Sequence, residues 1–198
     1  MKRTIKGTAS FILLIVSMLN LSCVSETSFF NKGSVDRKND KIAVLPFKDY
    51  NHNEGNNSGE LARSIFESTL LRRGFNVIEV EKTAVMVDFD FLEKNKFPSE
   101  WIIETGPAIG ADYMLYGSVH DYRTYQSSTS FLYLFSWLEI TSSVGITARL
   151  VSCKTGEVVW SGSLTRASYT FNDAAVEAIR DLVRTIKIRS AEDRKSVV

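Results

Sequence analysis

The pattern that most constrains this chain lies in residues 110–164, where three stretches have the spacing of β-strands. Residues 114–119 form a short apolar run of strand length, and residues 144–151 alternate as a strand with one buried face does. Alternation returns in residues 158–164, after a short turn that contains Gly156. Two strands joined by a few residues with a glycine are typical of an antiparallel hairpin. The three strands are therefore expected to form the middle of a sheet.

The residues before this region predict a β-α-β unit. Residues 42–47 are an apolar run that Pro46 is expected to close, because proline cannot donate to a sheet ladder. Residues 57–58 can cap a following helix, and Gly74 is expected to end that helix in the left-handed conformation. Residues 75–80 then form the second strand. In such a unit the two strands run parallel and the helix covers one face of the sheet.

Further helices are expected on either side of the central strands. Residues 81–97 permit a helix, and residues 101–109 predict a helical segment that is interrupted near Pro107. A closing amphipathic helix is expected to begin near the capping pair Asn172 and Asp173. Its apolar residues recur at helical spacing, with acidic residues early and basic residues late, as the helix dipole favours.

Together these elements predict an α/β (α+β) sandwich, with a mixed sheet of about five strands and helices packed on it. A length of 198 residues suits one domain with a leader. The domain is expected to cover residues 41–190, and a C-terminal tail is expected over residues 191–198.

The N-terminal residues 1–22 have the layout of an export signal. Three basic residues precede an apolar stretch over residues 11–21, which is too short to span a bilayer as a helix. Cys23 follows directly, and Leu-Asn-Leu-Ser-Cys at positions 19–23 resembles the lipobox of bacterial lipoproteins. The leader is therefore expected to be removed and Cys23 to carry a lipid. An ordinary secretory signal and an uncleaved membrane anchor are the alternatives.

A lipid on Cys23 would hold the protein at a membrane, since each buried methylene contributes about 0.8 kcal/mol. Residues 23–40 are mostly small and polar without a sustained period, and they predict a flexible tether. Val24 is not the acidic residue that retains some lipoproteins at the inner membrane. The expected location is therefore the outer membrane, with the domain facing the periplasm.

The charge of the mature chain argues against a nucleic-acid partner. Removing the leader takes three of the 24 Lys and Arg residues and none of the 23 Asp and Glu residues, which leaves a charge near −2. Binding to nucleic acid needs a basic surface that this balance does not supply.

Four segments, in order, resemble the CsgG-like family of curli-secretion lipoproteins. They are residues 42–47, the helix end with the strand after it at 71–78, residues 109–119 and residues 150–160. The resemblance extends to the amino-terminal domain of TolB and to the lipoprotein activators of penicillin-binding proteins. It implies a periplasmic α/β domain that binds or assembles other molecules and has no catalytic residue. Cys153 departs from the Asp common at this turn of the family.

The aromatic run over residues 131–138 is the best candidate for an interaction site. An exposed apolar patch of this kind would mark a contact with a membrane or a protein. Burial as an extra strand or helix turn over the domain's own core is an equally open alternative. Secretion pores of the family extend alternating strands into the membrane, and this run does not alternate, which counts against a pore. The candidate residues are Phe131, Tyr133, Phe135, Trp137 and Leu138.

No pattern in the sequence indicates an enzyme, a metal site or a cofactor. The two histidines, His52 and His120, lack the spacing of a zinc site, and there is no phosphate-binding loop or nucleophile elbow. Asp88 and Asp90 could share a strand face as paired carboxylates, but solvated charges beside packed aromatic residues are the favoured interpretation. The protein is expected to be non-enzymatic and to need no cofactor.

These features predict a lipid-anchored periplasmic protein that acts in the assembly or regulation of an envelope or secretion system. Its expected partners are the membrane, through the lipid, and an envelope protein or further copies of itself. Two alternatives are an oligomeric secretion-channel subunit of the outer membrane and a lipoprotein activator of a peptidoglycan synthase.

The leader generates a direct prediction about lipidation. Cells that express the protein in the presence of radiolabelled palmitate should incorporate the label into it, and Cys23→Ala should abolish the incorporation because it removes the acceptor thiol. Label that persists in the variant would place the lipid elsewhere, and absence of label in the parent chain would contradict the lipoprotein signal.

Overall fold

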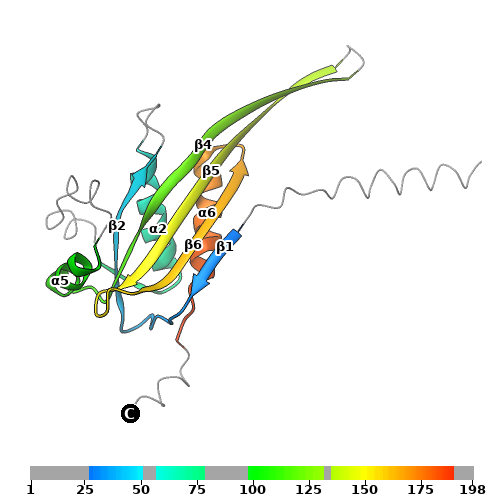
Figure 1. The fold of residues 1–198 in the computed structure, drawn as a ribbon. Coiled ribbons are helices and arrows are strands. Elements are labelled where there is room, and N and C mark those ends of the chain that lie inside the picture. Colours follow the sequence, from blue (N-terminus) through cyan, green and yellow to red (C-terminus); the bar gives the residue numbers. More distant parts are fainter. Residues whose placement is uncertain (1–26, 51–56, 79–97, 132–134, 190–198) are drawn as a thin grey trace, which may run out of the picture.

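A computed structural model describes residues 27–50, 57–78, 98–131 and 135–189 of the chain. Its described strands form one mixed sheet in the order β1-β6-β5-β4-β2-β3 (Figure 1). The predicted fold class, a mixed sheet with helices packed on it, is confirmed. The strands are β1 (Thr27–Asn31), β2 (Lys41–Asp49), β3 (Asn76–Ile78), β4 (Tyr113–Phe131), β5 (Phe135–Ser152) and β6 (Val158–Ser168).

The antiparallel strands β4, β5 and β6 form the centre of the sheet, as predicted. Leu150 on β5 lies between Leu115 on β4 and Trp160 on β6 in the register of the ladder. The turn between β5 and β6 contains Gly156 at φ 69°, in the left-handed region that glycine enters without strain. The hairpin inferred from residues 144–164 is thereby confirmed.

The predicted β-α-β unit is also present, with one correction. Helix α2 (Ser58–Arg72) connects β2 to the parallel strand β3, and Gly74 follows the helix at φ 78°. The prediction that Pro46 ends the first strand is wrong, because β2 continues to Asp49. Proline is accommodated because the register of β2 against β4 shifts between Val44 and Phe47, so Pro46 lies at an irregularity in the ladder.

Two details predicted for the helices are wrong, namely the interruption at Pro107 and the residues that cap the last helix. Helix α5 (Ser99–Ile109) runs through Pro107 without interruption, and Gly110 ends it, donating its backbone N–H to the Pro107 carbonyl. Because proline has no backbone N–H, position 107 donates no hydrogen bond within the helix, and the helix continues for two more residues to Ile109. Helix α6 (Phe171–Arg184) begins near residues 172–173 as predicted, but Thr170 caps it, because the Thr170 hydroxyl accepts the backbone N–H of Asp173 at 3.1 Å. The helix predicted over residues 81–97 lies outside the described residues.

The helices cover the two faces of the sheet unequally. Helices α2 and α6 pack side by side on one face, over a large core that includes Phe66, Leu150 and Trp160 (Figure 1). Helix α5 packs on the other face over a smaller cluster around Leu45 and Ile102, beside one end of β2, β4 and β5. Within the described parts of the chain, no helix has the length and apolar character needed to cross a bilayer.

Much of the segment predicted as a tether belongs to the fold. Strand β1 pairs antiparallel with β6 at the edge of the sheet, and Val35 is 1% exposed and bridges to Ile188. Residues 27–40 are therefore an ordered part of the structure, contrary to the prediction of a flexible tether over 23–40. The sequence was misleading here because an edge strand of five residues can be polar and still gain a full set of ladder bonds on one side.

Strands β4 and β5 continue beyond the rest of the sheet as a long two-stranded ribbon (Figure 1). The last pair of β5 with β6 is Ser142 with Ser168, whereas β4 and β5 stay paired to Phe131 and Phe135. A register shift between His120 and Arg123 marks the place where the ribbon leaves the sheet.

The tight centre of the sheet yields a stability prediction. A Cβ at Gly117 would lie 2.1 Å from the backbone oxygen of Thr147 and 2.6 Å from the Phe47 ring. Gly117→Ala should therefore lower the free energy of unfolding in urea by about 1–3 kcal/mol, the usual cost of overpacking. Ser118→Ala, on the neighbouring residue of the same strand, is the control and should change it little. Equal stability of the two variants would contradict the packing described.

Candidate interaction surface

The face of the sheet opposite α2 and α6 is the candidate interaction surface, and we call it the open face. Among the described elements only α5 packs on this side, and it does so at one end. Apart from Gly145, which lies under the His120 ring, the residues of the open face are partly or fully exposed. The open face consists of Ser28 and Phe30 on β1, Ser161, Ser163 and Thr165 on β6, Gly145, Thr147 and Arg149 on β5, and Tyr116, Ser118 and His120 on β4.

A row of hydroxyl groups crosses this face. The register aligns Ser28, Ser163, Thr147 and Ser118 on four consecutive strands. The Thr147 and Ser163 hydroxyl oxygens are 3.0 Å apart and share a hydrogen bond. Each hydroxyl can both donate and accept, so the row offers polar contacts to a partner laid across the strands.

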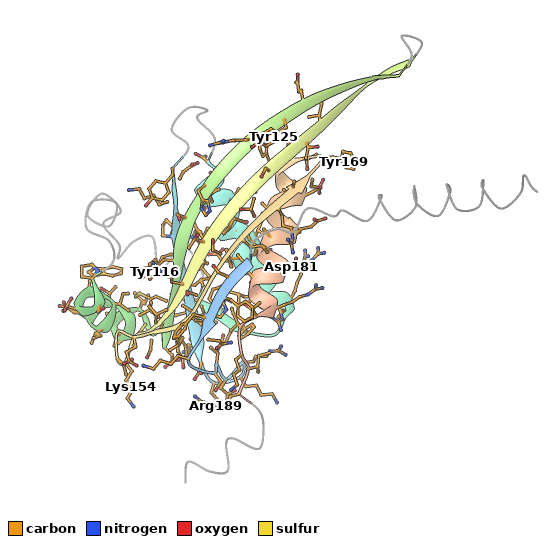
Figure 2. The ribbon with its side chains drawn as sticks, turned by 45° about the vertical axis from the view of Figure 1, so that its right-hand side comes forward. Tyr116, Tyr125, Lys154, Tyr169, Asp181 and Arg189 are labelled. Atoms are coloured by element: carbon orange, nitrogen blue, oxygen red, sulfur yellow. The ribbon has the colours of Figure 1, made fainter. Side chains whose placement is uncertain are left out.

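A second row beside it carries a positive charge. Phe30, Ser161, Arg149 and Tyr116 are aligned across the same four strands, and Arg149 is exposed. Figure 2 labels Tyr116 on the lower part of β4 and Tyr125 further along the ribbon. The residues that define the open face include an arginine and a histidine and no carboxylate. Their charge and hydroxyl groups suit a polar or acidic protein surface.

The predicted aromatic run lies at the far end of the ribbon. The register pairs Phe131 with Phe135, Thr129 with Trp137 and Ser128 with Leu138. The side chains of these residues, and Tyr133 as a whole, lie outside what the structure describes. The structure thus brings four of the five candidates together as neighbours in one ladder, and their role in binding stays a prediction. Cys23 also lies outside the described residues.

Metal binding and thiol chemistry find no support among the described residues. In this part of the chain no group of three or more His, Cys, Asp and Glu residues could hold a metal ion. Cys153 is 2% exposed, and burial raises the pKa of its thiol to about 12, with a smaller effect from the charge of Asp112. Because the thiolate is the nucleophilic form, the burial and the raised pKa predict low reactivity of the Cys153 thiol at neutral pH.

Sequence reasoning missed the open face, although its signal is visible. Ser161, Ser163 and Thr165 alternate with the core residues of β6, and Thr147 holds the matching position on β5. Such polar alternation predicts a strand with one solvated face. The alternation does not predict the strand register, and it is the register that aligns hydroxyl groups from residues far apart in the sequence into one row.

The comparison with protein families gives one decisive match. Residues 57–165, from the start of α2 to β6, match the family described as peptidoglycan-synthase activator LpoB, and this segment is more than half of the chain. The chain belongs to the LpoB family. The resemblance to lipoprotein activators is thereby confirmed, whereas the match does not single out the CsgG-like family. None of the curated proteins matches this LpoB-family chain in sequence.

Solved structures show the same fold in other proteins. A PelC dodecamer from Paraburkholderia phytofirmans is 20% identical, with a TM-score of 0.58, over 84% of this chain and 100% of that chain. A variant of the same PelC dodecamer gives a TM-score of 0.57 at the same identity and coverage. At this level of identity the similarity establishes the fold. Lipoprotein GNA1162 from Neisseria meningitidis is also similar, at 20% identity and a TM-score of 0.46 over 74% of this chain and 97% of that chain.

The burial of Cys153 predicts how this thiol behaves. At about pH 8 a thiol reagent should modify the folded protein far more slowly than the protein unfolded in urea, because the folded state holds the thiol protonated. Rapid modification of the folded protein would contradict the burial of this side chain.

The same pKa shift predicts a loss of stability at high pH. The pKa rises from 9.0 to about 12 on folding, so the stabilising effect is complete below pH 9.0 and is lost as the pH rises towards 12. Urea unfolding should show a smaller decrease in stability over this range for Cys153→Ala than for the parent chain.

Proposed function

We propose that this protein is a lipid-anchored, non-enzymatic activator of a peptidoglycan synthase, held at the outer membrane through Cys23 and facing the periplasm. The observation that carries the proposal is the family match over residues 57–165. These residues include α2, α5, β3, β4, β5 and most of β6, and so include most of the open face and the whole ribbon.

The open face is the proposed contact with the synthase. It is largely free of covering helices, and it presents Arg149 between the Tyr116 and Ser161 positions. Charged and polar groups at such an interface select the partner and set the orientation of docking. The aromatic run at 131–138 would extend the contact beyond the body of the domain.

Activation without a catalytic group requires a difference in binding. An activator accelerates an enzyme only if it binds the active conformation more tightly than the inactive one. Typical coupling free energies of about 1–3 kcal/mol correspond to about 5- to 150-fold changes in an equilibrium. A rigid sheet face suits this task because its contacts are set before binding and little conformational entropy is lost.

Self-association is a second candidate function, favoured by the ribbon. Within the described residues, β4 pairs with β2 only to Val119 and β5 pairs with β6 only to Ser142. Both outer edges of the ribbon beyond these points thus have backbone groups open to another chain. The dodecameric form of PelC is compatible with such an arrangement. Sedimentation of the acylated protein in detergent distinguishes a ring from a monomer.

The proposal predicts the effect of reversing one charge. Arg149→Glu should weaken binding to a peptidoglycan synthase from the same cell and should reduce its stimulation several-fold, because it replaces the exposed cation of the open face. The measurement is the rate of glycan-strand synthesis from a lipid-linked precursor, with and without the activator.

Arg180→Glu is the matched control, since Arg180 is exposed on α6, on the other side of the sheet. It should leave stimulation near that of the parent chain. Equal losses in both variants would argue against the open face as the contact. A parent protein that neither binds nor stimulates the synthase would overturn the proposed function.

A further inference from the structure

The proposed lipid lies very close to the folded domain. Only residues 24–26 separate Cys23 from Thr27, which already pairs with Leu164 in the sheet. Four residue steps span at most about 14 Å in a fully extended chain. A lipid on Cys23 therefore holds the β1 edge of the sheet near the bilayer surface, because no long linker separates the lipid from the domain.

Two large apolar side chains are exposed on this edge strand. Phe29 is 62% exposed and Phe30 is 50% exposed, although both belong to β1. Consecutive strand residues lie on opposite faces of a sheet. A partner that binds one face of the sheet can therefore contact only one of the two rings. A surface that lies against the edge of the sheet can contact both.

A third exposed aromatic residue lies beside the same edge. Tyr169 directly follows β6, the strand next to β1, and is 81% exposed. Figure 2 shows its side chain standing clear of the ribbon at the end of β6. Tyrosine suits the boundary between lipid and water, because its ring is apolar and its hydroxyl group is polar.

We infer that the β1 edge of the sheet docks on the phospholipid bilayer, with Phe29, Phe30 and Tyr169 at the level of the headgroups. This inference rests on the lipid at Cys23, which is part of the proposed function. The contact is interfacial, because the outer backbone groups of β1 need water as hydrogen-bond partners. Edge-on docking leaves the open face standing out of the membrane plane, accessible to a protein partner.

The experiment places a fluorescent probe at the edge and at a matched distant position. Phe30→Cys and Leu71→Cys are each labelled with bimane in the full-length acylated protein. Leu71 is 56% exposed on α2, which packs against β2 and β3 at the opposite edge of the sheet. The label goes to the new cysteine because Cys153 is buried and Cys23 is acylated.

The labelled proteins are reconstituted into vesicles of phosphatidylethanolamine and phosphatidylglycerol that contain a doxyl-labelled phospholipid. Bimane at position 30 should be quenched by the lipid several-fold more strongly than at position 71 and should be protected from iodide in the water. Phe29→Cys provides a second edge probe and should behave like Phe30→Cys. Equal, weak quenching by lipid at the edge and at position 71 would overturn edge-on docking.

Two further outcomes are informative. Protection from iodide at position 30 without quenching by lipid would show that protein covers the edge, for example a second copy, and would also overturn the inference. Two other measurements test the lipid anchor independently of the edge. Vesicle flotation measures binding to the membrane, and the mass of the N-terminal peptide shows whether Cys23 is acylated. An acylated protein that floats with an unquenched edge contradicts only the docking, whereas a protein without the acyl group contradicts the lipid-anchored function as well.

Discussion

The ladder between β4 and β5 is the interaction on which the rest of the structure depends. It begins with Tyr113 opposite Ser152 and continues to Phe131 opposite Phe135. One face of its inner half is buried under α2 and α6, and its outer half forms a ribbon that would be marginal alone. Because side chains alternate with a period of two, a slip of one residue would expose Leu115 and bury polar neighbours. The packed inner half therefore sets the register of the whole ribbon.

The unequal covering of the sheet explains how one domain could hold two kinds of contact. Helices α2 and α6 bury one face, so residues such as Trp160, whose indole N–H donates to the Thr185 hydroxyl at 2.8 Å, stabilise the fold. The opposite face contributes little of its area to the core and is left for a partner. The β1 edge lies at the side of the sheet and shares only Ser28 and Phe30 with the open face. Contact with a bilayer there would leave the open-face residues on β6, β5 and β4 to a synthase.

Several parts of the fold were predictable because their causes are local. The alternation in residues 144–164 and Gly156 in the turn specify a hairpin, and Gly74 ends the helix before β3. Predictions failed where distant contacts override local preference. Pro46 is accommodated by a shift in a ladder with β4, and residues 27–31 become a strand only because β6 offers them an edge.

The sequence alone determined the class of fold, the central hairpin, the β-α-β unit and the absence of motifs for known catalytic chemistry, since these follow from periodicity and residue type within short windows. The resemblance to lipoprotein activators was also visible in the sequence. Only the tertiary structure decided which polar residues form a surface. Ser28, Ser163, Thr147 and Ser118 are far apart in the chain, and only strand order and register bring their hydroxyl groups into one row. Likewise, the closeness of Cys23 to the sheet follows from the pairing of Thr27 with Leu164, a contact that no local pattern encodes.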